Sequence, residues 1–451
     1  MNNTNNKDTT QITSKDFTDD YLTDYASYSI LRAIPSAIDG LKNSQRKIIF
    51  TKLAHPNNEK VSEIATSIIK KAQYLHGDAS GVVANLCKDY TGSNNLPLLK
   101  KDGAFGTRFN KEPAASRYIS ASMNNLVFKD EYNDVLITQE FEGTKIEPKF
   151  YIPVVPLILV NGGQGVATGF ASNVSPYKLE DVIQAIKDTL DGKDVELVPG
   201  YNNFDGTVEV NPEGDGSFIE KGVLTESSGS KGQTVQTTFT ITEIPTSYNL
   251  KSYTKVLDKL EEQGLIKYED KSDSLEDTFL FVVKVQKNAR TSADTDKVKS
   301  KLLKSLSKPI SQNFTLLDEN NIPRVFDDVQ EVLKYYLEVT LKYTELRRLN
   351  SVQKEQHNND KLMNIMRFIK EVNNGFNINR ASDEVKRDLE ALDYSNISTL
   401  LSLPIGRLQK DEIIKLQAKI DKSLEFINTL ESISSKEMYL NDLNELEETI
   451  C

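Results

Sequence analysis

The residues with the clearest potential for chemistry are an arginine and a tyrosine adjacent in the chain, Arg117 and Tyr118. A tyrosine hydroxyl can attack phosphorus, but it is a poor nucleophile at neutral pH until another group removes or shares its proton. A guanidinium remains charged and offers a fork of donors that suits phosphate oxygens. The chain has 18 tyrosines and such pairs are common by chance, so the pair alone does not identify a site.

Histidine and cysteine are too sparse to suggest a metal centre. His55, His76 and His357 lie far apart in the sequence, and Cys87 and Cys451 are too few for a disulfide framework or a cysteine-rich zinc site. We therefore expect no metal bound by this chain alone. His76 follows an apolar run, where a structural role is the more common one, although its ring could also hydrogen-bond a phosphate oxygen.

Charge is unevenly distributed along the chain. The net charge is −11, yet residues 31–120 hold 14 Lys and Arg against 7 Asp and Glu, and residues 321–451 hold 18 against 23. Two interpretations of the basic segment remain open: a randomly uneven solvated surface, or a face that binds phosphates.

Length and composition indicate a soluble multidomain protein. A chain of 451 residues is too long for one ordinary core, and no apolar run approaches the roughly 18 residues of a membrane-spanning helix. The polar N-terminus carries no signal-peptide pattern, so we expect a cytoplasmic protein. Residues 1–15 are too polar to form a core, and we predict a disordered tail there.

Helices are predicted at 21–32, 41–53, 61–75 and 79–90, with glycine-containing turns between them. The last two could form a helix-turn-helix pair that enters a major groove, although most short helical hairpins bind nothing.

Residues 131–325 have a mixed pattern, with β-branched runs at 206–210, 237–241 and 279–283. Two long apolar stripes follow, at 332–372 and 413–427, around a segment that contains glycine and proline. The stripes fit two antiparallel helices joined by a small knob, although an ordinary helical-bundle core is the more common source of such stripes.

Several strings in one order resemble the type IIA DNA topoisomerases. They are RAIP at 32–35, DGLK at 39–42, QRK at 45–47, YLHGD at 74–78, GSNNL at 92–96, FGTR at 105–108, AASRY at 114–118 and GVATG at 165–169. The resemblance is close over 16–180 and looser over the rest. It is closer to the eukaryotic and phage branches than to bacterial gyrase, and closest to the T-even-type bacteriophage branch, in which the activities are split over separate polypeptides.

The resemblance implies an α+β multidomain fold in three parts. These are a winged-helix DNA-cleavage domain at 16–130, a mixed α/β tower domain at 131–325, and a long antiparallel coiled coil with a small knob for dimerisation at 326–451.

The resemblance also implies roles for individual residues. Tyr118 would be the nucleophile on a DNA phosphate, Arg117 would stabilise the transition-state charge, and His76 would contact a phosphate oxygen. Val166 occupies the position of a wedge residue, usually isoleucine, that bends the duplex. Basic residues at or beside family positions that contact DNA phosphates are Arg32, Lys42, Arg46, Lys47, Lys70 and Arg108.

The implied function is transient double-strand breakage through 5′-phosphotyrosine links, to relax and unlink DNA. Because the sequence shows no convincing carboxylate cluster, Mg²⁺ is expected to come with a partner subunit that also binds ATP. The other expected partners are double-stranded DNA and a second copy of the chain, in the host cytoplasm if the chain is phage-encoded. The competing hypothesis is a non-catalytic, dimeric DNA-binding scaffold.

Overall fold

The computed structural model describes residues 13–212, 217–231, 234–286 and 292–450. By its internal contacts the chain divides into two compact units. Unit 1 comprises Met1–Lys129, Leu136–Thr340 and Glu445–Cys451, and unit 2 comprises Asp130–Val135 and Leu341–Asn444. The fold is mixed α and β and multidomain, as predicted. Unit 1 does not separate 16–130 from 131–325, so that boundary stays a prediction.

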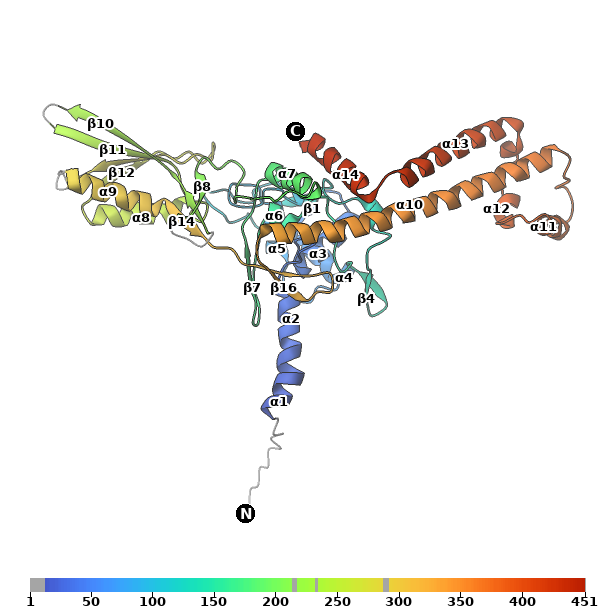
Figure 1. The fold of residues 1–451 in the computed structure, drawn as a ribbon, viewed down its shortest axis with the longest axis horizontal. Coiled ribbons are helices and arrows are strands. Elements are labelled where there is room, and N and C mark those ends of the chain that lie inside the picture. Colours follow the sequence, from blue (N-terminus) through green and yellow to red (C-terminus); the bar gives the residue numbers. More distant parts are fainter. Residues whose placement is uncertain (1–12, 213–216, 232–233, 287–291, 451) are drawn as a thin grey trace, which may run out of the picture. The chain divides into compact units, whose positions relative to one another are not determined.

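The N-terminal part of unit 1 is helical (Figure 1). Most of the predicted tail, residues 1–12, lies outside the described residues, but Ser14 and Lys15 are already helical. The helices are α1 (Ser14–Asp16), the π-helical η1 (Phe17–Leu22), α2 (Thr23–Ala33), α3 (Asn43–Ala54), α4 (Val61–Lys71) and α5 (Ser80–Cys87). The four predicted helices are thereby confirmed, although the third ends four residues earlier than expected.

Helix α4 shows why these segments fold as they do. Val61, Ile64, Ala65 and Ile68 follow the helical spacing of three and four residues, and all four are buried. Next to the helices, β1 (Glu59–Lys60), β2 (Leu99–Asp102) and β3 (Ser120–Met123) form an antiparallel sheet in the order β1-β3-β2. This sheet joins the start of α4 to the segment that follows Tyr118.

Short elements follow in the next part of the chain. They are η2 (Asp130–Tyr132), β4 (Gln139–Phe141), β5 (Thr144–Ile146), α6 (Leu157–Val160), β6 (Gly163–Val166), β7 (Ala171–Val174) and α7 (Leu179–Leu190). Strands β6 and β7 form a hairpin. Gly165 is required there because a Cβ at this position would lie 2.2 Å from the Ala33 carbonyl oxygen at the end of α2.

Two sheets dominate the rest of unit 1 (Figure 1). A three-stranded sheet has the order β14-β9-β8, and a four-stranded sheet has the order β10-β11-β13-β12. Buried Phe239, Ile241 and Phe281 of the larger sheet share a core with Tyr253 and Leu257 of the adjacent helix. The elements are β8 (Thr207–Val210), β9 (Phe218–Lys221), β10 (Val223–Lys231), β11 (Thr234–Glu243), α8 (Leu250–Glu262), β12 (Ile266–Asp270), β13 (Phe281–Val285), α9 (Ser292–Ser305) and β14 (Ser307–Ile310). All three predicted strands are present.

Unit 2 is helical. After the hairpin of β15 (Phe314–Leu317) and β16 (Pro323–Phe326), the 45-residue helix α10 (Val329–Asn373) begins in unit 1 and continues into unit 2. It is followed by α11 (Ser382–Ala391), α12 (Ile397–Leu401), the 3-10 turn η3 (Ile405–Leu408), α13 (Lys410–Ser432) and α14 (Ser435–Ile450). Among the described residues, no helix is both long and apolar enough to cross a membrane.

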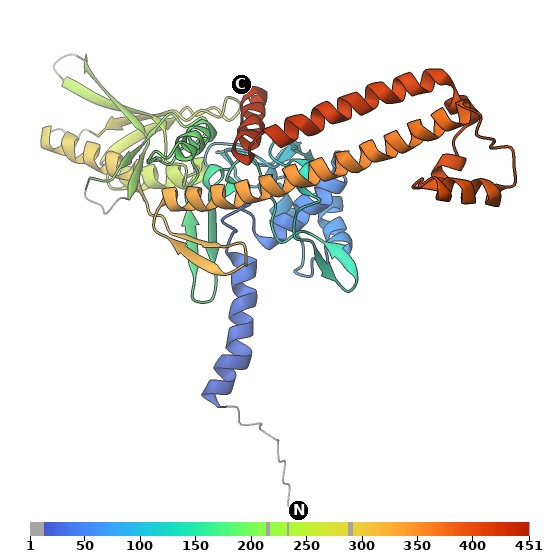
Figure 2. The same ribbon diagram turned by 45° about the vertical axis from the view of Figure 1, so that its right-hand side comes forward.

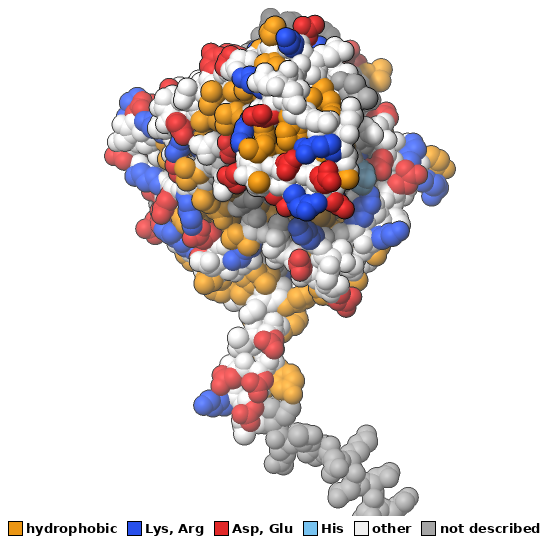
Figure 3. Space-filling view, turned by 90° about the vertical axis from the view of Figure 1, so that its right-hand side faces the viewer, with side chains coloured by type: hydrophobic (Ala, Val, Ile, Leu, Met, Phe, Trp, Pro, Cys, Tyr) orange, Lys and Arg blue, Asp and Glu red, His pale blue; other side chains and the backbone are white. Residues whose placement is uncertain are grey.

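Helices α10 and α13 run side by side in opposite directions (Figure 2). Arg348 Nη1 donates to the Leu430 carbonyl at 2.9 Å, and Asn373 Nδ2 donates to the Leu408 carbonyl at 2.8 Å, so the late part of α10 lies beside the start of α13. The connecting helices enclose their own small core of Phe368, Val385, Leu389, Tyr394 and Leu400. Figure 3 faces the connecting helices of unit 2 and shows exposed hydrophobic side chains among charged ones.

Candidate active site and nucleic-acid interface

The adjacent pair Arg117 and Tyr118 lies in a turn that enters β3. The Tyr118 amide donates to the Ala115 carbonyl at 2.9 Å, which closes the turn. At the start of α4, the Ser62 and Val61 amides donate to the carbonyls on either side of the pair, those of Ser116 and Ile119, at 3.3 and 3.0 Å. The backbone of this turn is thus fixed by hydrogen bonds, while the Tyr118 side chain that it carries is 67% exposed.

Two cations surround this tyrosine. The Arg117 guanidinium carbon lies 4.7 Å from the centre of the Tyr118 ring, which is a cation–π contact. Lys60 Nζ donates to the Tyr118 carbonyl at 3.4 Å. Sequence analysis missed Lys60, because only the pairing of β1 with β3 brings it to this turn. The local geometry can therefore present a nucleophile to an anionic substrate.

His76 lies elsewhere, between two other tyrosines. The Tyr28 hydroxyl is 2.7 Å from His76 Nε2 and 3.1 Å from Nδ1, and the Tyr74 ring meets the imidazole edge-on at 5.7 Å between centroids. These contacts do not include Arg117 or Tyr118. The structure thus joins two of the three predicted catalytic residues and gives the third a partner, Tyr28, that sequence analysis did not identify.

Arg46 is not available to DNA in this structure. It is buried, its Nε and Nη2 donate to the two Asp39 carboxylate oxygens at 2.7 and 3.0 Å, and Nη2 also donates to the Leu41 carbonyl. Although burial opposes the charge, the Asp39 carboxylate outweighs it and raises the pKa of Arg46. The predicted phosphate contact does not fit this arrangement.

Lys47 and Arg108 are buried in the same way. Lys47 Nζ lies 2.8 Å from a Glu147 carboxylate oxygen, and Arg108 Nη1 lies 2.6 Å from Glu243 Oε1. Burial raises the pKa of Glu243, and Arg108 acts in the opposite direction. Both cations are thus paired with carboxylates inside the protein. We therefore withdraw Arg46, Lys47 and Arg108 as predicted DNA contacts.

The other predicted DNA-binding residues are accessible to different degrees. Arg32 and Lys70 are exposed, whereas Lys42 is half-buried and burial lowers its pKa. Val166 is 84% exposed at the end of β6, next to the turn of the β6–β7 hairpin. An apolar side chain this exposed on a well-formed hairpin is suited to contact a partner molecule.

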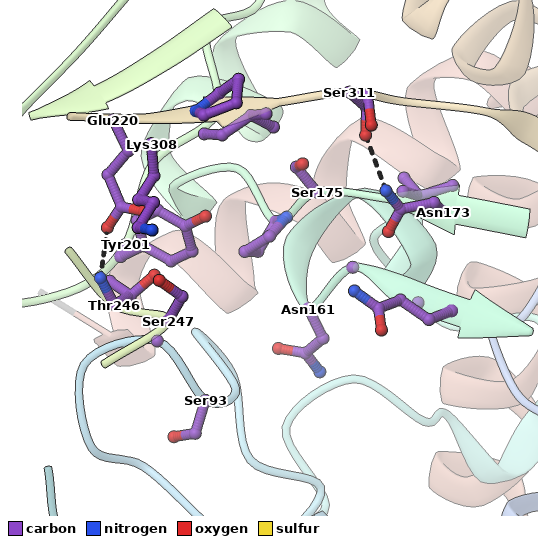
Figure 4. A pocket seen from close by; sticks show the side chains of 18 of the residues that line it. Ser93, Asn161, Asn173, Ser175, Tyr201, Glu220, Thr246, Ser247, Lys308 and Ser311 are labelled. Carbon is purple, nitrogen blue, oxygen red and sulfur yellow. Dashed lines mark hydrogen bonds between the residues drawn. The ribbon is translucent and has the colours of Figure 1, made fainter. Parts of the chain in front are cut away.

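A polar hollow of about 630 Å³ lies beside the same hairpin (Figure 4). Its polar groups largely satisfy one another. Asn173 Nδ2 donates to the Ser311 carbonyl at 2.6 Å, the Thr246 amide donates to Glu220 Oε1 at 2.6 Å, and Lys111 Nζ donates to the Thr246 carbonyl at 2.8 Å. None of the residues predicted to be catalytic lines it. We do not assign the expected DNA-breakage reaction to this hollow.

In the part of the chain that the structure describes, no three His, Cys, Asp or Glu side chains converge into a metal site built from protein ligands alone. A Mg²⁺ ion commonly takes only one or two protein carboxylates, with phosphate oxygens and waters as its other ligands.

Comparison with known proteins identifies the family. The sequence model that describes the A subunits of DNA gyrase and topoisomerase IV matches residues 32–447. The chain belongs to this family. Its matched region contains the turn with Arg117 and Tyr118, His76 itself and the β6–β7 hairpin, whereas Tyr28 lies just before it.

Individual topoisomerases are similar over most of the chain. The DNA topoisomerase medium subunit of Enterobacteria phage T4 is 32% identical over 94% of this chain and 96% of its own length. DNA topoisomerase 2 of Invertebrate iridescent virus 6 is 28% identical over 97% of this chain, which spans only 39% of that relative. The chain likewise spans 35% of the mitochondrial DNA topoisomerase 2 of Dictyostelium discoideum.

A solved structure supports the same assignment. The "DNA-binding, cleavage and re-ligation domain" of Plasmodium falciparum topoisomerase II has a TM-score of 0.85 and 26% identity, covering 96% of this chain and 64% of that one. The phage similarity agrees with the branch predicted from the sequence strings.

Proposed function

We propose that this chain is the DNA breakage-and-rejoining subunit of an ATP-dependent type II DNA topoisomerase. The observation that carries the proposal is the exposed Tyr118 on a fixed turn, with the guanidinium of Arg117 against its ring. This pair occurs in a chain that belongs to the gyrase and topoisomerase IV family. A scaffold protein that had lost catalysis would have no need to keep either side chain.

In the proposed reaction, the Tyr118 oxygen attacks a backbone phosphorus of DNA. A bond forms between this oxygen and phosphorus as the tyrosine hydroxyl loses its proton to solvent. The bond from phosphorus to the 3′ oxygen breaks, that oxygen takes up a proton from solvent, and the 5′ end stays linked to the tyrosine. Arg117 would stabilise the charge on the non-bridging oxygens, and Lys60 would add positive potential at the turn. Attack by the free 3′ hydroxyl reverses the step. The phosphodiester is conserved, so religation needs no energy source.

We propose that the β1-β3-β2 sheet and helices α3 to α5 act as a winged-helix module that binds the DNA duplex. Arg32, Lys70 and the half-buried Lys42 supply cations for phosphates, a kind of contact that positions the duplex but reads little sequence. Val166 would act as the wedge between base pairs. Valine is one methylene smaller than the isoleucine usual in the family, so it would support the bend over a smaller area.

We propose that a partner subunit supplies ATP hydrolysis and holds Mg²⁺. The N-terminal helical segment offers a surface on which a partner could dock, because Phe17, Tyr21 and Tyr25 repeat every four residues and are 53%, 57% and 62% exposed. An exposed apolar row of this kind normally marks an interaction surface. The complex would act in the cytoplasm, where the DNA of a bacterial host lies.

A second copy of the chain is the other proposed partner, since two tyrosines must act to cut both strands. The four-stranded sheet region would form the tower, and the antiparallel helices of unit 2 would form the coiled coil. Unit 2 exposes large apolar side chains suited to dimerisation, among them Leu392, Ile414 and Phe426.

The test is reconstitution with the ATPase and metal-binding subunit, Mg²⁺ and supercoiled plasmid, stopped with detergent. We expect protein-linked double-strand breaks, with the DNA attached to the peptide that contains Tyr118. Mass spectrometry of the nuclease-trimmed peptide identifies the linked residue. DNA binding without any covalent product, in a complex that hydrolyses ATP, would instead identify a scaffold.

A further inference from the structure

We propose that Tyr28 is a positioning residue for His76 and selects which imidazole nitrogen faces a DNA phosphate. This inference rests on the proposed function, because it gives Tyr28 a task in the phosphate contact expected of His76. Tyr28 itself lies outside the strings that predicted the site. Its starting point is the contact between the Tyr28 hydroxyl on α2 and the imidazole of His76, 2.7 Å from Nε2.

The surroundings of His76 leave its ring few other restraints. His76 is exposed, and it is followed by Gly77 at φ +76°, a left-handed backbone conformation that glycine adopts without steric cost. Tyr74 contacts one side of the ring edge-on, and Tyr28 lies on another side, with 5.6 Å between ring centroids. Of these two neighbours, only Tyr28 contributes a hydrogen bond.

The hydrogen bond has a chemical consequence. A neutral imidazole has one donor and one acceptor nitrogen, and the partner of one nitrogen fixes the role of the other. The Tyr28 hydroxyl is closer to Nε2 than to Nδ1, by 2.7 against 3.1 Å. Both nitrogens lie within hydrogen-bond distance of this hydroxyl. If Tyr28 donates to Nε2, the nearer one, then Nδ1 carries the proton and is the nitrogen that can donate to a phosphate oxygen.

A purely structural role does not explain this pair. Tyr28 is 45% exposed, and the only buried residue of α2 is Ile30, so the hydroxyl contributes little to a core. The pair instead connects the N-terminal helical segment to the predicted phosphate-binding histidine. A shift of α2 would move the Tyr28 hydroxyl away from His76, which would link docking on that segment to the state of the imidazole.

The first test does not depend on activity. The chain has only three histidines, so the side-chain ¹⁵N resonances of His76 can be assigned by substitution. In Tyr28→Phe we expect the Nδ1 and Nε2 shifts of His76 to move toward those of a free imidazole, while those of His55 and His357 stay constant. Unchanged His76 shifts would overturn the proposal.

The second test uses the reconstituted complex. Tyr28→Phe should lower the rate of covalent-complex formation about fivefold, the size expected for one lost hydrogen bond, and should change its pH profile. Tyr268→Phe is the matched control, because it removes a tyrosine hydroxyl bonded to Asp258 in the four-stranded sheet region. It should leave both quantities unchanged.

A double-mutant cycle separates this role from any other effect of the substitution. In a His76→Ala background, Tyr28→Phe should have no further effect on the rate, since the side chain that it positions is gone. A full fivefold loss in that background would overturn the proposal. A wild-type chain that forms no covalent complex would refute the proposed function instead, and the ¹⁵N shifts would still decide whether Tyr28 orients His76.

Discussion

The basic residues in the family-like sequence strings occupy two different environments: some are exposed and others are buried. Arg117 is exposed beside Tyr118, whereas Arg46, Lys47 and Arg108 are buried against Asp39, Glu147 and Glu243. A buried cation must be paired, because removal from water costs several kcal/mol per ion. A basic residue in a nucleic-acid-binding motif can therefore hold the binding surface together without touching the nucleic acid.

The two groups should respond to substitution in opposite ways. Removing an exposed cation should weaken catalysis or DNA binding and leave folding intact. Removing a buried one should destabilise the fold, and DNA binding per folded molecule should change little. The following variants test this contrast.

The largest effect is expected for Tyr118→Phe. This change deletes the proposed nucleophilic oxygen and almost no surface, so detergent-trapped covalent complexes should disappear while DNA affinity stays nearly intact. Gel assays of trapped breaks and a binding titration measure the two quantities. Continued formation of covalent complexes by this variant would rule out Tyr118 as the nucleophile.

Arg108→Ala should lower the free energy of unfolding by about 3–5 kcal/mol, because it leaves the Glu243 carboxylate buried without its partner. Denaturant unfolding measures the loss. The double variant Arg108→Met/Glu243→Leu should recover most of it, since no unpaired charge remains. A stable Arg108→Ala variant with weakened DNA binding would return Arg108 to the interface.

The same variant should show a defined pH dependence. Burial raises the pKa of Glu243, and removing Arg108 takes away an opposing influence. The folded state then binds a proton more tightly than the unfolded state, so the stability deficit is largest at high pH and shrinks as the pH falls through the folded-state pKa. Unfolding curves at several pH values test the sign, and a deficit that grows on acidification would contradict it.

Arg117→Ala should slow covalent-complex formation by about 10²–10³-fold, the usual effect of losing one preorganised donor to a transition-state oxyanion. Melting temperature should remain unchanged, because Arg117 is exposed. Arg117→Lys should recover part of the rate, since it restores the charge without the fork of donors. Equal rates for wild type and Arg117→Ala would place the stabilising charge on another residue, with Lys60 the next candidate.

The smallest effects are expected for Arg32→Ala and Lys70→Ala. Each should reduce the slope of log affinity against log salt by about 1, the loss of one phosphate contact. Lys193→Ala is a suitable control, because Lys193 is a surface lysine paired with Asp188. An unchanged slope for both variants would remove these residues from the interface.

Local patterns made most helices predictable from the sequence. The stripe from Val61 to Ile68 predicted α4 because helical spacing is a property of neighbouring residues. The ordered strings predicted Tyr118 as the nucleophile, and that role stays a prediction. The predicted end of that helix at residue 75 was wrong: α4 stops at Lys71, and Gln73 has a positive φ of 51°.

Properties set by distant partners could not be predicted. Lys47 pairs with Glu147, a hundred residues away, and Arg108 pairs with Glu243, further away still. Their burial therefore could not be inferred from local sequence. The same reason hid the contacts of Lys60 with Tyr118 and of Tyr28 with His76, which depend on strand pairing and helix placement.

Helix α2 links several parts of this surface. Tyr28 contacts His76, Ser29 Oγ accepts a hydrogen bond from the Thr168 amide at 3.3 Å, and the Ala33 carbonyl leaves no room for a side chain at Gly165. One short helix thus touches both the imidazole and the hairpin that carries Val166. Substitutions in α2 are therefore constrained by its contacts with His76 and with the β6–β7 hairpin. Compensating changes at these two places should arise together when lineages diverge.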